Sequence, residues 1–281
     1  MIMRILILGA KGMLGNELAK VFAKHKPFLW DLDEIDITDR SQVEQKISNL
    51  APELIINAAA YTDVDACEEN EELATKVNGE AVGYLADVAH HLKVTLVHYS
   101  TDYVFDGNNK QGYVEDDELS PVNAYGRSKL SGELRVTSYE LRDFYLIRTA
   151  WLYGLQGKNF VETMLSMAQA VEPLKVIDDQ VGSPTYAPDL AEATLDIIES
   201  KKPYGIYHRT NSGQTSWYGF AKEIFEIFGK KVELGPCTTE EYPLPAKRPK
   251  YSVLQSTKLE PMRSWQEALK DYYERNHPSR R

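Results

Sequence analysis

The chain has 281 residues, is 43% apolar and carries a formal net charge of −10. This length accommodates one large domain or two unequal domains with a substantial core. The acidic balance argues against nucleic-acid binding, because neutralising phosphates needs a dense basic face. Any anionic ligand must therefore be held by a local cluster of basic residues.

Cysteine usage and apolar runs indicate the cellular compartment of the protein. Cys67 and Cys237 are too few for a disulfide framework, and their neighbours lack metal-ligand spacing. The first apolar run, Ile5 to Leu8, is too short for a signal-peptide core. No later stretch approaches the roughly 18 uncharged apolar residues of a membrane helix. We expect a cytoplasmic protein that binds no metal and contacts neither membrane nor nucleic acid.

The first half of the chain alternates short β-rich runs with amphipathic helical stretches. The predicted strands are Arg4–Leu8, Phe28–Leu32, Leu54–Asn57, Thr95–Tyr99 and Phe144–Arg148. The predicted helices are Met13–Lys24, Ser41–Leu50, Glu71–Leu92 and Ala124–Tyr139. This alternation predicts an α/β fold with a doubly wound parallel (Rossmann) sheet covered on both faces.

After about Arg148 the pattern loosens, with many glycines and prolines and two later helical stretches, Ser216–Phe228 and Trp265–Tyr273. We predict a first domain over residues 1–150, to which later segments can return. A smaller, partly irregular substrate-binding domain would occupy mainly residues 151–281. No low-complexity linker separates the two, so we expect a substrate cleft between them.

A glycine-rich string follows the first predicted strand and opens the first helix. Backbone amides at a helix N-terminus bind a pyrophosphate, and glycines allow the tight turn and close approach to the ligand. This context predicts NADH or NADPH binding by Gly9, Lys11, Gly12, Met13, Leu14 and Gly15. No Gly-Lys-Ser/Thr follows, which argues against a P-loop.

Acidic and small residues follow the second and third predicted strands. Asp31, Asp33 and Asp36 stand where an acid reaches the adenosine ribose, although a solvated loop explains at least two of them. Such an acid favours NADH, but Lys11 could accommodate a 2′-phosphate, so both cofactors stay open. Small residues after the third strand let the backbone lie beside a ligand, and tight packing would also explain them. We assign Asp31, Asp36, Ile37, Ala59, Ala60 and Tyr61 to the cofactor.

Tyr125 and Lys129 have the i, i+4 spacing that places both side chains on one helical face. A neighbouring ammonium favours phenolate and lowers the tyrosine pKa from about 10. Tyr125 would then serve as a general acid for a carbonyl that receives hydride. By itself this spacing is common and usually marks a surface helix.

A third element stands at the end of the fourth predicted strand, where Thr101 follows Ser100. Open α/β folds bind ligands at the carboxyl edge of the sheet, so a hydroxyl there can orient a substrate carbonyl. Alone, it would more simply cap the strand. With the glycine string and the Tyr125/Lys129 pair in this chain order, we expect all three to face one site.

Several strings are distinctive in combination: GAKGMLG, NAAAYTDVD, STDYVFDG, YGRSK, RTAWLYG, the segment from Asp178 to Thr185, and Arg248-Pro249. Through them the chain resembles the extended short-chain dehydrogenases, and among these the dTDP-4-dehydrorhamnose reductases, over essentially its whole length. The resemblance implies reduction of a dTDP-linked keto sugar, with Thr101, Tyr125 and Lys129 as the catalytic set. It also implies that Thr62, Val64, Tyr103 and Trp151 approach the sugar, and it allows a homodimer.

The second half has one dense basic group, formed by Lys247, Arg248 and Lys250. A forked guanidinium suits a diphosphate better than a point charge does, so we assign Arg248 to the substrate. A solvated loop is nearly as good an explanation for the lysines. Trp151 could stack on the sugar or base, or simply pack.

Two alternatives remain. A nucleotide-sugar epimerase or dehydratase shares this fold and the Tyr/Lys pair, but related dehydratases carry Asp-Glu where this chain has Asp102 and Tyr103. A non-catalytic regulatory subunit, like that of methionine adenosyltransferase, would keep the fold without needing catalysis. The intact set of Thr101, Tyr125 and Lys129 favours a reductase over both.

Overall fold

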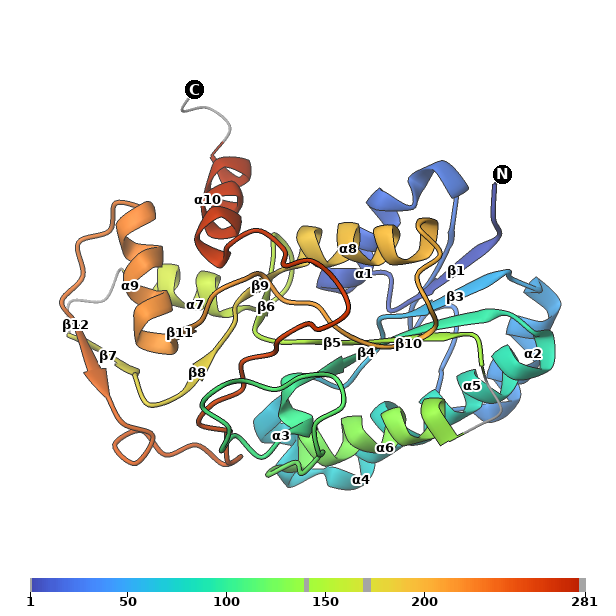
Figure 1. Cartoon of the computed structure of the whole chain (residues 1–281), viewed down its shortest axis with the longest axis horizontal. Coiled ribbons are helices and arrows are strands. Elements are labelled where there is room, and N and C mark those ends of the chain that lie inside the picture. The colour runs from blue at the N-terminus through green and yellow to red at the C-terminus, as the bar shows by residue number, and fades with distance from the viewer. Residues whose placement is uncertain (1, 139–141, 169–172, 278–281) are drawn as a thin grey trace.

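The computed structural model describes residues 2–138, 142–168 and 173–277. Its centre is a six-stranded parallel sheet in the order β10-β5-β4-β3-β1-β2 (Figure 1). The strands are β1 (Ile5–Leu8), β2 (Phe28–Trp30), β3 (Leu54–Asn57), β4 (Thr95–Thr101), β5 (Phe144–Thr149) and β10 (Gly205–His208). The predicted α/β class and doubly wound sheet are confirmed.

Helices cover both faces of this sheet (Figure 1). One face carries α1 (Met13–Val21) and α8 (Ala187–Glu199); the other carries α2 (Arg40–Leu50), α5 (Ala81–Leu92) and α6 (Ala124–Ser138). The predicted end of the last helix at Tyr139 lies outside the described residues. Shorter elements of this half are η1 (Ala23–His25), α3 (Val64–Glu69), α4 (Glu71–Thr75), the π-helix η2 (Lys76–Glu80) and η3 (Asp102–Val104).

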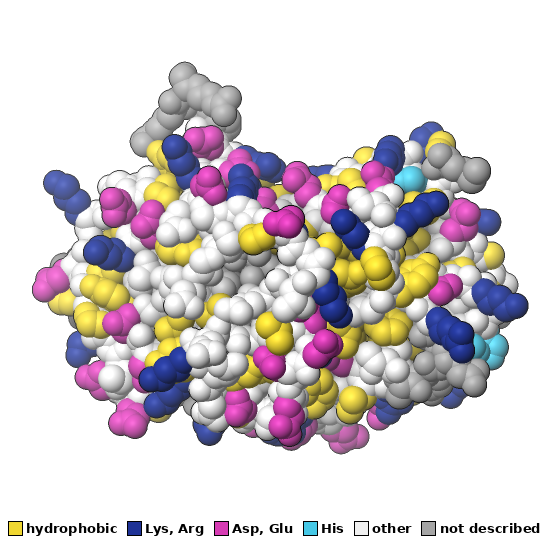
Figure 2. Space-filling model, in the orientation of Figure 1, with side chains coloured by type: hydrophobic (Ala, Val, Ile, Leu, Met, Phe, Trp, Pro, Cys, Tyr) yellow, Lys and Arg dark blue, Asp and Glu magenta, His cyan; other side chains and the backbone are white. Residues whose placement is uncertain are grey.

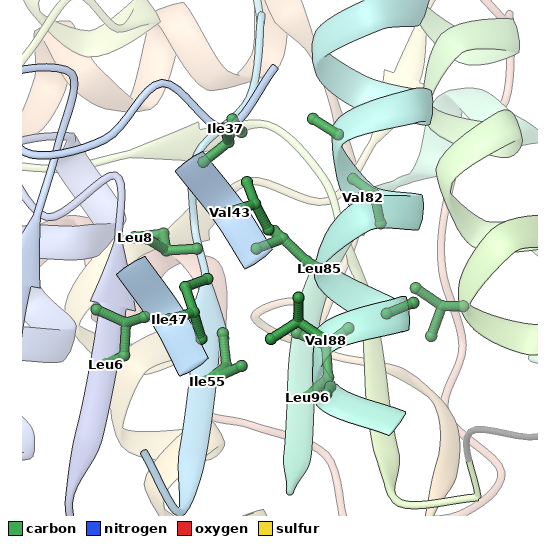
Figure 3. Close-up of a cluster of buried hydrophobic side chains, with 14 of the residues drawn as sticks. Leu6, Leu8, Ile37, Val43, Ile47, Ile55, Val82, Leu85, Val88 and Leu96 are labelled. Carbon is green, nitrogen blue, oxygen red and sulfur yellow. The ribbon is translucent and has the colours of Figure 1, made fainter. Parts of the chain in front are cut away.

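Alternation along the strands divides the core into two layers, because successive strand side chains point to opposite faces. Leu6 and Leu8 of β1 pack against α2 and α5, as Figure 3 shows. Ile5 and Ile7 pack on the other side against α1 and α8. All four side chains are fully buried, which explains why β1 is a continuous apolar run rather than an alternating one.

The second part of the chain lies at one end of the molecule and has its own aromatic core (Figure 1). Its helices are α7 (Phe160–Met167), α9 (Trp217–Ile227) and α10 (Trp265–Asn276). Its strands are β6 (Leu152–Tyr153), β7 (Leu174–Ile177), β8 (Val181–Gly182), β9 (Thr185–Tyr186), β11 (Thr215–Ser216) and β12 (Leu234–Cys237), which form three two-stranded sheets. Both α8 and β10 follow residue 150 in the chain and nevertheless pack on the main sheet.

The surface is mixed in charge: on the face shown in Figure 2, acidic side chains are interspersed with lysines and arginines. In the described part of the chain, no helix combines the length and apolarity needed to cross a bilayer.

A buried ion pair joins α6 to β5. Arg148 of β5 and Glu133 of α6 form two close contacts, with Nε donating to Oε1 at 3.0 Å and Nη2 to Oε2 at 2.7 Å. Their side chains are only 1% and 2% exposed. Arg148 also donates through Nη1 to the Glu115 carbonyl oxygen at 3.0 Å. All the hydrogen bonds of this guanidinium are thus made inside the protein.

His208 of β10 completes this network. Its Nδ1 lies 3.1 Å and 3.0 Å from the carbonyl oxygens of Tyr113 and Gln255, so Nδ1 carries the hydrogen. Its Nε2 is then free to accept from Arg148 Nη1 at 3.3 Å. Burial, with the charge of Arg148, lowers the pKa of His208 to about 4. The imidazole is therefore neutral, and the network ties the edge strand to α6 without adding a second buried cation.

We expect Glu133→Gln to lower the free energy of unfolding by about 3–5 kcal/mol, because it leaves the buried Arg148 guanidinium uncompensated. The matched control is Glu71→Gln, which breaks a pair with Arg127 whose side chains are 47% and 45% exposed. Solvent screens that pair, so its loss should cost about 0–1 kcal/mol. Urea unfolding measures both, and equal effects would contradict the importance of the buried pair.

Candidate active site

A cavity of about 680 Å³ opens at the carboxyl edge of the parallel sheet, between the sheet and the second part of the chain. Parallel strands end at the same edge, which is where open α/β folds bind ligands. The cavity brings together many of the predicted site residues from separate segments. These are Gly12, Met13, Leu14, Ala59, Ala60, Thr62, Val64, Thr101, Tyr103, Tyr125, Lys129, Trp151 and Arg248.

The other predicted cofactor residues are not among the described residues that line this cavity: Gly9, Lys11, Gly15, Asp31, Asp36, Ile37 and Tyr61. Gly9 and Gly15 have a structural role in the turn before α1. Gly9 has φ +70°, and a Cβ on it would stand 2.6 Å from the Ala59 backbone nitrogen. A Cβ on Gly15 would overlap the Gly9 carbonyl oxygen. These two glycines allow the turn between β1 and α1 to close.

The first turn of α1 presents free backbone donors to the cavity. Its N-cap is Gly12, which has no side chain to cap the first amides. The helix dipole adds a partial positive charge at this end. The donors, the charge and the tight glycine turn fit the pyrophosphate of a dinucleotide.

The residues after β2 have local partners. Asp31 accepts a hydrogen bond from the Lys11 backbone nitrogen at 2.9 Å, which ties it to the glycine turn. The Lys11 ammonium pairs with Asp33, and both side chains are exposed. Asp36 accepts from the Thr38 amide and hydroxyl. Ile37 is packed in the core beside Val43 (Figure 3). The part these side chains play in cofactor binding stays a prediction.

Helix α6 holds the Tyr/Lys pair in the cavity. Asn123 precedes it and accepts from the Gly126 amide at 2.7 Å, as an N-cap does. Lys129 is 3% exposed, and its ammonium donates to the Tyr99 carbonyl oxygen at 2.7 Å. Burial lowers the pKa of Lys129 to about 8, while the charge of Glu133 acts in the opposite direction.

The predicted lowering of the Tyr125 pKa by Lys129 is wrong. Burial raises the pKa of the Tyr125 phenol, and the charge of Asp102 raises it further, while the Thr101 hydroxyl partly opposes the shift. Helical spacing places the two side chains on one face, but it does not place the ammonium on the phenol oxygen. Tyr125 is therefore held in its protonated form, ready to donate.

Polar groups without partners surround the end of β4. Ser100 Oγ, Asp102 Oδ2 and Thr149 Oγ1 are buried, form no hydrogen bond, and belong to residues that line the cavity. Buried polar atoms are nearly always paired, so three unpaired ones on residues of a single cavity mark this region as unlike the rest of the core. Thr149 was missed from the sequence because nothing around it signals more than the end of a strand.

Arg248 is already engaged by Asp65 of α3. Its Nη1 and Nη2 donate to Oδ1 and Oδ2 of Asp65, both at 2.8 Å, and this contact lowers the pKa of the carboxyl. The predicted role in diphosphate binding therefore requires the guanidinium N–H groups that do not bond to Asp65. The sequence does not reveal this pair, since its members are 183 positions apart.

Trp151 forms an aromatic wall with a residue that sequence reasoning missed. Its ring stacks on Trp217 with centroids 3.4 Å apart and planes 5° from parallel. Trp151 also adopts the left-handed φ of +48°, a conformation that costs a non-glycine residue energy and clusters at ligand sites. Gly182 makes room for it, since a Cβ there would stand 2.5 Å from the indole. Both indoles line the cavity.

Tyr61 is connected to α6 through the π-helix η2. Asn78 accepts from the Tyr61 amide at 2.8 Å and donates to its carbonyl oxygen at 2.9 Å. Its amide nitrogen is also 3.0 Å from Ser128 Oγ on α6. The loop after β3 therefore moves with the helix that carries Tyr125.

Sheet order, glycine turn and cavity together are those of an NAD(P)-dependent oxidoreductase of the short-chain dehydrogenase type.

Comparison with known proteins narrows this class. The family model described as RmlD substrate binding domain matches residues 3–277. A dTDP-4-dehydrorhamnose reductase of Burkholderia thailandensis is 40% identical over 276 residues, covering 92% of each chain. The spore coat polysaccharide biosynthesis protein SpsK of Bacillus subtilis is 41% identical over 277 residues, covering 96% of each.

A solved structure agrees with these matches. The dTDP-4-dehydrorhamnose reductase of Bacillus anthracis, in complex with NADP, has a TM-score of 0.93 at 39% identity, covering 97% of this chain and 99% of that one. The chain therefore belongs to the dTDP-4-dehydrorhamnose reductase family.

The burial of Asp102 gives a stability prediction. The carboxyl is 2% exposed, and burial raises its pKa from 3.8 to about 7. Between these values the unfolded chain binds fewer protons than the folded one, so the free energy of unfolding falls as pH rises. Asp102→Asn removes this titration. We expect the stability of the variant relative to wild type to rise by roughly 1–4 kcal/mol between about pH 4 and pH 7.

Urea unfolding at several pH values checks this expectation. A difference between variant and wild type that stays constant across the window would contradict a raised Asp102 pKa.

Proposed function

We propose that this chain reduces the C4 ketone of dTDP-4-dehydro-6-deoxy-L-mannose to dTDP-L-rhamnose, using NADPH or NADH. The observation that carries the proposal is the meeting of Thr101, Tyr125 and Lys129 with the uncapped first turn of α1 at one cavity. Family membership supports the same activity, since relatives at about 40% identity carry this reductase name.

Bound reduced nicotinamide would supply the hydride. The backbone amides of Met13 and Leu14, at the start of α1 after Gly12, would hold its pyrophosphate, and Ala59 and Ala60 would form the wall beside it. Lys129, whose ammonium is buried at the end of β4, would donate to the nicotinamide ribose as well as to Tyr99. The glycine turn explains why this ligand can lie directly on the backbone.

Tyr125 would donate its phenolic proton to the ketone oxygen as that oxygen becomes a hydroxyl. A general acid must hold its proton before the step, and the raised pKa ensures this at neutral pH. Thr101 would orient the same oxygen. Thr62, Val64, Tyr103 and Trp151 would contact the sugar, with Arg248 toward the diphosphate.

The environment of Tyr103 favours reduction over dehydration. Its ring packs edge-on against Tyr125, with centroids 5.8 Å apart and an interplanar angle of 77°. An elimination would need a second acid at this position, next to Asp102, and a buried phenol with a raised pKa does not supply one. A purely regulatory subunit would have no need to bury an ammonium and unpaired hydroxyls at the cavity.

We expect Tyr125→Phe to lower kcat by about 10²–10⁴-fold, because it removes the proton donor and keeps the ring. Tyr242→Phe, at a tyrosine that is 54% exposed, is the matched control and should keep wild-type turnover. The assay follows loss of reduced-nicotinamide absorbance with the dTDP-4-keto-6-deoxy-L-sugar prepared in situ, testing NADPH and NADH separately.

Near-normal turnover of Tyr125→Phe would contradict the role of the phenol as the general acid. Cofactor binding by wild type without any turnover would favour another keto sugar or a regulatory subunit. A cytoplasmic location and a homodimer stay predictions; light scattering of the purified protein tests the second.

A further inference from the structure

The hydrogen bonds of Thr101 conflict with its expected role. A hydroxyl has one hydrogen to donate and two lone pairs. Thr101 Oγ1 donates that hydrogen to Asp102 Oδ1 at 2.9 Å and accepts from the Tyr103 amide at 3.1 Å. Only one lone pair is left, and the Tyr125 phenol lies close enough to interact with the same hydroxyl. A ketone oxygen is also an acceptor, so Thr101 cannot donate to it in this arrangement.

Asp102 is the group that takes the hydrogen. It is 2% exposed, it lines the cavity, and its Oδ2 is buried without a hydrogen-bond partner. None of the ion pairs found among the described residues includes it. Burial raises the pKa of this carboxyl, and contacts with the Ser252 and Thr101 hydroxyls and the Tyr103 amide partly oppose that shift.

Among the described residues, the charge of Asp102 acts on two phenols that flank it. Tyr103 lies beside it in η3, and Tyr125 faces it from α6; an ionised Asp102 raises the pKa of both. The cations that line the same cavity are Lys129, Lys158 and Arg248. Lys129 is directed to the Tyr99 carbonyl oxygen and Arg248 to Asp65.

We propose that Asp102 is a positioning residue whose protonation decides whether Thr101 donates to the substrate ketone or withholds its hydrogen. When Asp102 is protonated, its carboxyl O–H donates to Thr101 Oγ1, and the Thr101 hydrogen turns to the ketone oxygen. When Asp102 is ionised, it accepts the hydrogen bond from Thr101, which then has no hydrogen to donate to the ketone. The proposal rests on the reductase activity proposed above.

The charge of Asp102 favours the same protonation state for reduction as the hydrogen-bond geometry does. Tyr125 gains negative charge as it gives up its proton, and an ionised Asp102 opposes this because it raises the phenol pKa. Both effects make the protonated carboxyl the competent form. Since burial raises the pKa of Asp102 to about 7, reduction should weaken as pH rises through neutrality.

The test is the pH dependence of kcat/KM for the keto sugar, at saturating NADPH, for wild type, Asp102→Asn and Thr101→Val. Wild type should fall by about tenfold in all between about pH 6 and pH 8.5, and then level off at the activity of the ionised form. Asp102→Asn presents a permanent N–H donor to Thr101, so it should lack this decline and exceed wild type by about tenfold at about pH 8.5.

Thr101→Val isolates the hydroxyl itself. Wild type should exceed it by about tenfold near pH 6, where Thr101 donates, and this ratio should approach one near pH 8.5. A constant ratio would overturn the proposal even if Asp102→Asn did not fold. The proposal is also wrong if Asp102→Asn keeps the wild-type decline, because the titrating group would then be another, such as Lys129.

Infrared titration separates this inference from the proposed function. The carbonyl band of the protonated carboxyl in ¹³C-aspartate-labelled wild type, absent from Asp102→Asn, should disappear near pH 7. Ionisation of Asp102 at its ordinary pKa would overturn the inference whatever the turnover. Absence of turnover at every pH, with this band titrating near neutrality, would instead count against the proposed substrate, while the neutral-pH ionisation of Asp102 would still be supported.

Discussion

The buried ion pair between Glu133 and Arg148 fixes the helix on which the rest of the site depends. Glu133 follows Lys129 by one turn of α6, so anchoring it on β5 sets how far Tyr125 and Lys129 reach over the sheet edge. The same guanidinium holds the Glu115 carbonyl and the neutral His208. One arginine therefore connects the helix and the edge strand, and His208 extends the connection to the C-terminal segment.

The cavity differs from the rest of the interior in how its polar groups are satisfied. Around Arg148, buried donors and acceptors are matched, as a stable core requires. At the end of β4, hydroxyls and a carboxylate oxygen lack partners. An unpaired buried polar group typically costs about 1–3 kcal/mol, which the fold tolerates where a ligand can make the missing bonds. The electrostatics follow from the same burial, because it raises the pKa of Tyr125 and Asp102 and lowers that of Lys129.

Two contacts at the cavity join residues that are distant in the chain. Trp151 stacks on Trp217, and Arg248 pairs with Asp65, so each contact joins segments that no local pattern connects.

Sequence alone determined the parts of this protein that depend on near neighbours. Apolar runs marked β1, β3, β4 and β5, glycines marked the turn into α1, and the spacing of Tyr125 and Lys129 placed both on one helical face. It missed β10, whose four residues form a strand only because β5 offers an edge to pair with. Tertiary structure decided the partner of Arg248, the stacking of Trp217 and the direction of the Tyr125 pKa. These depend on burial and on contacts across many residues, which a local pattern does not contain.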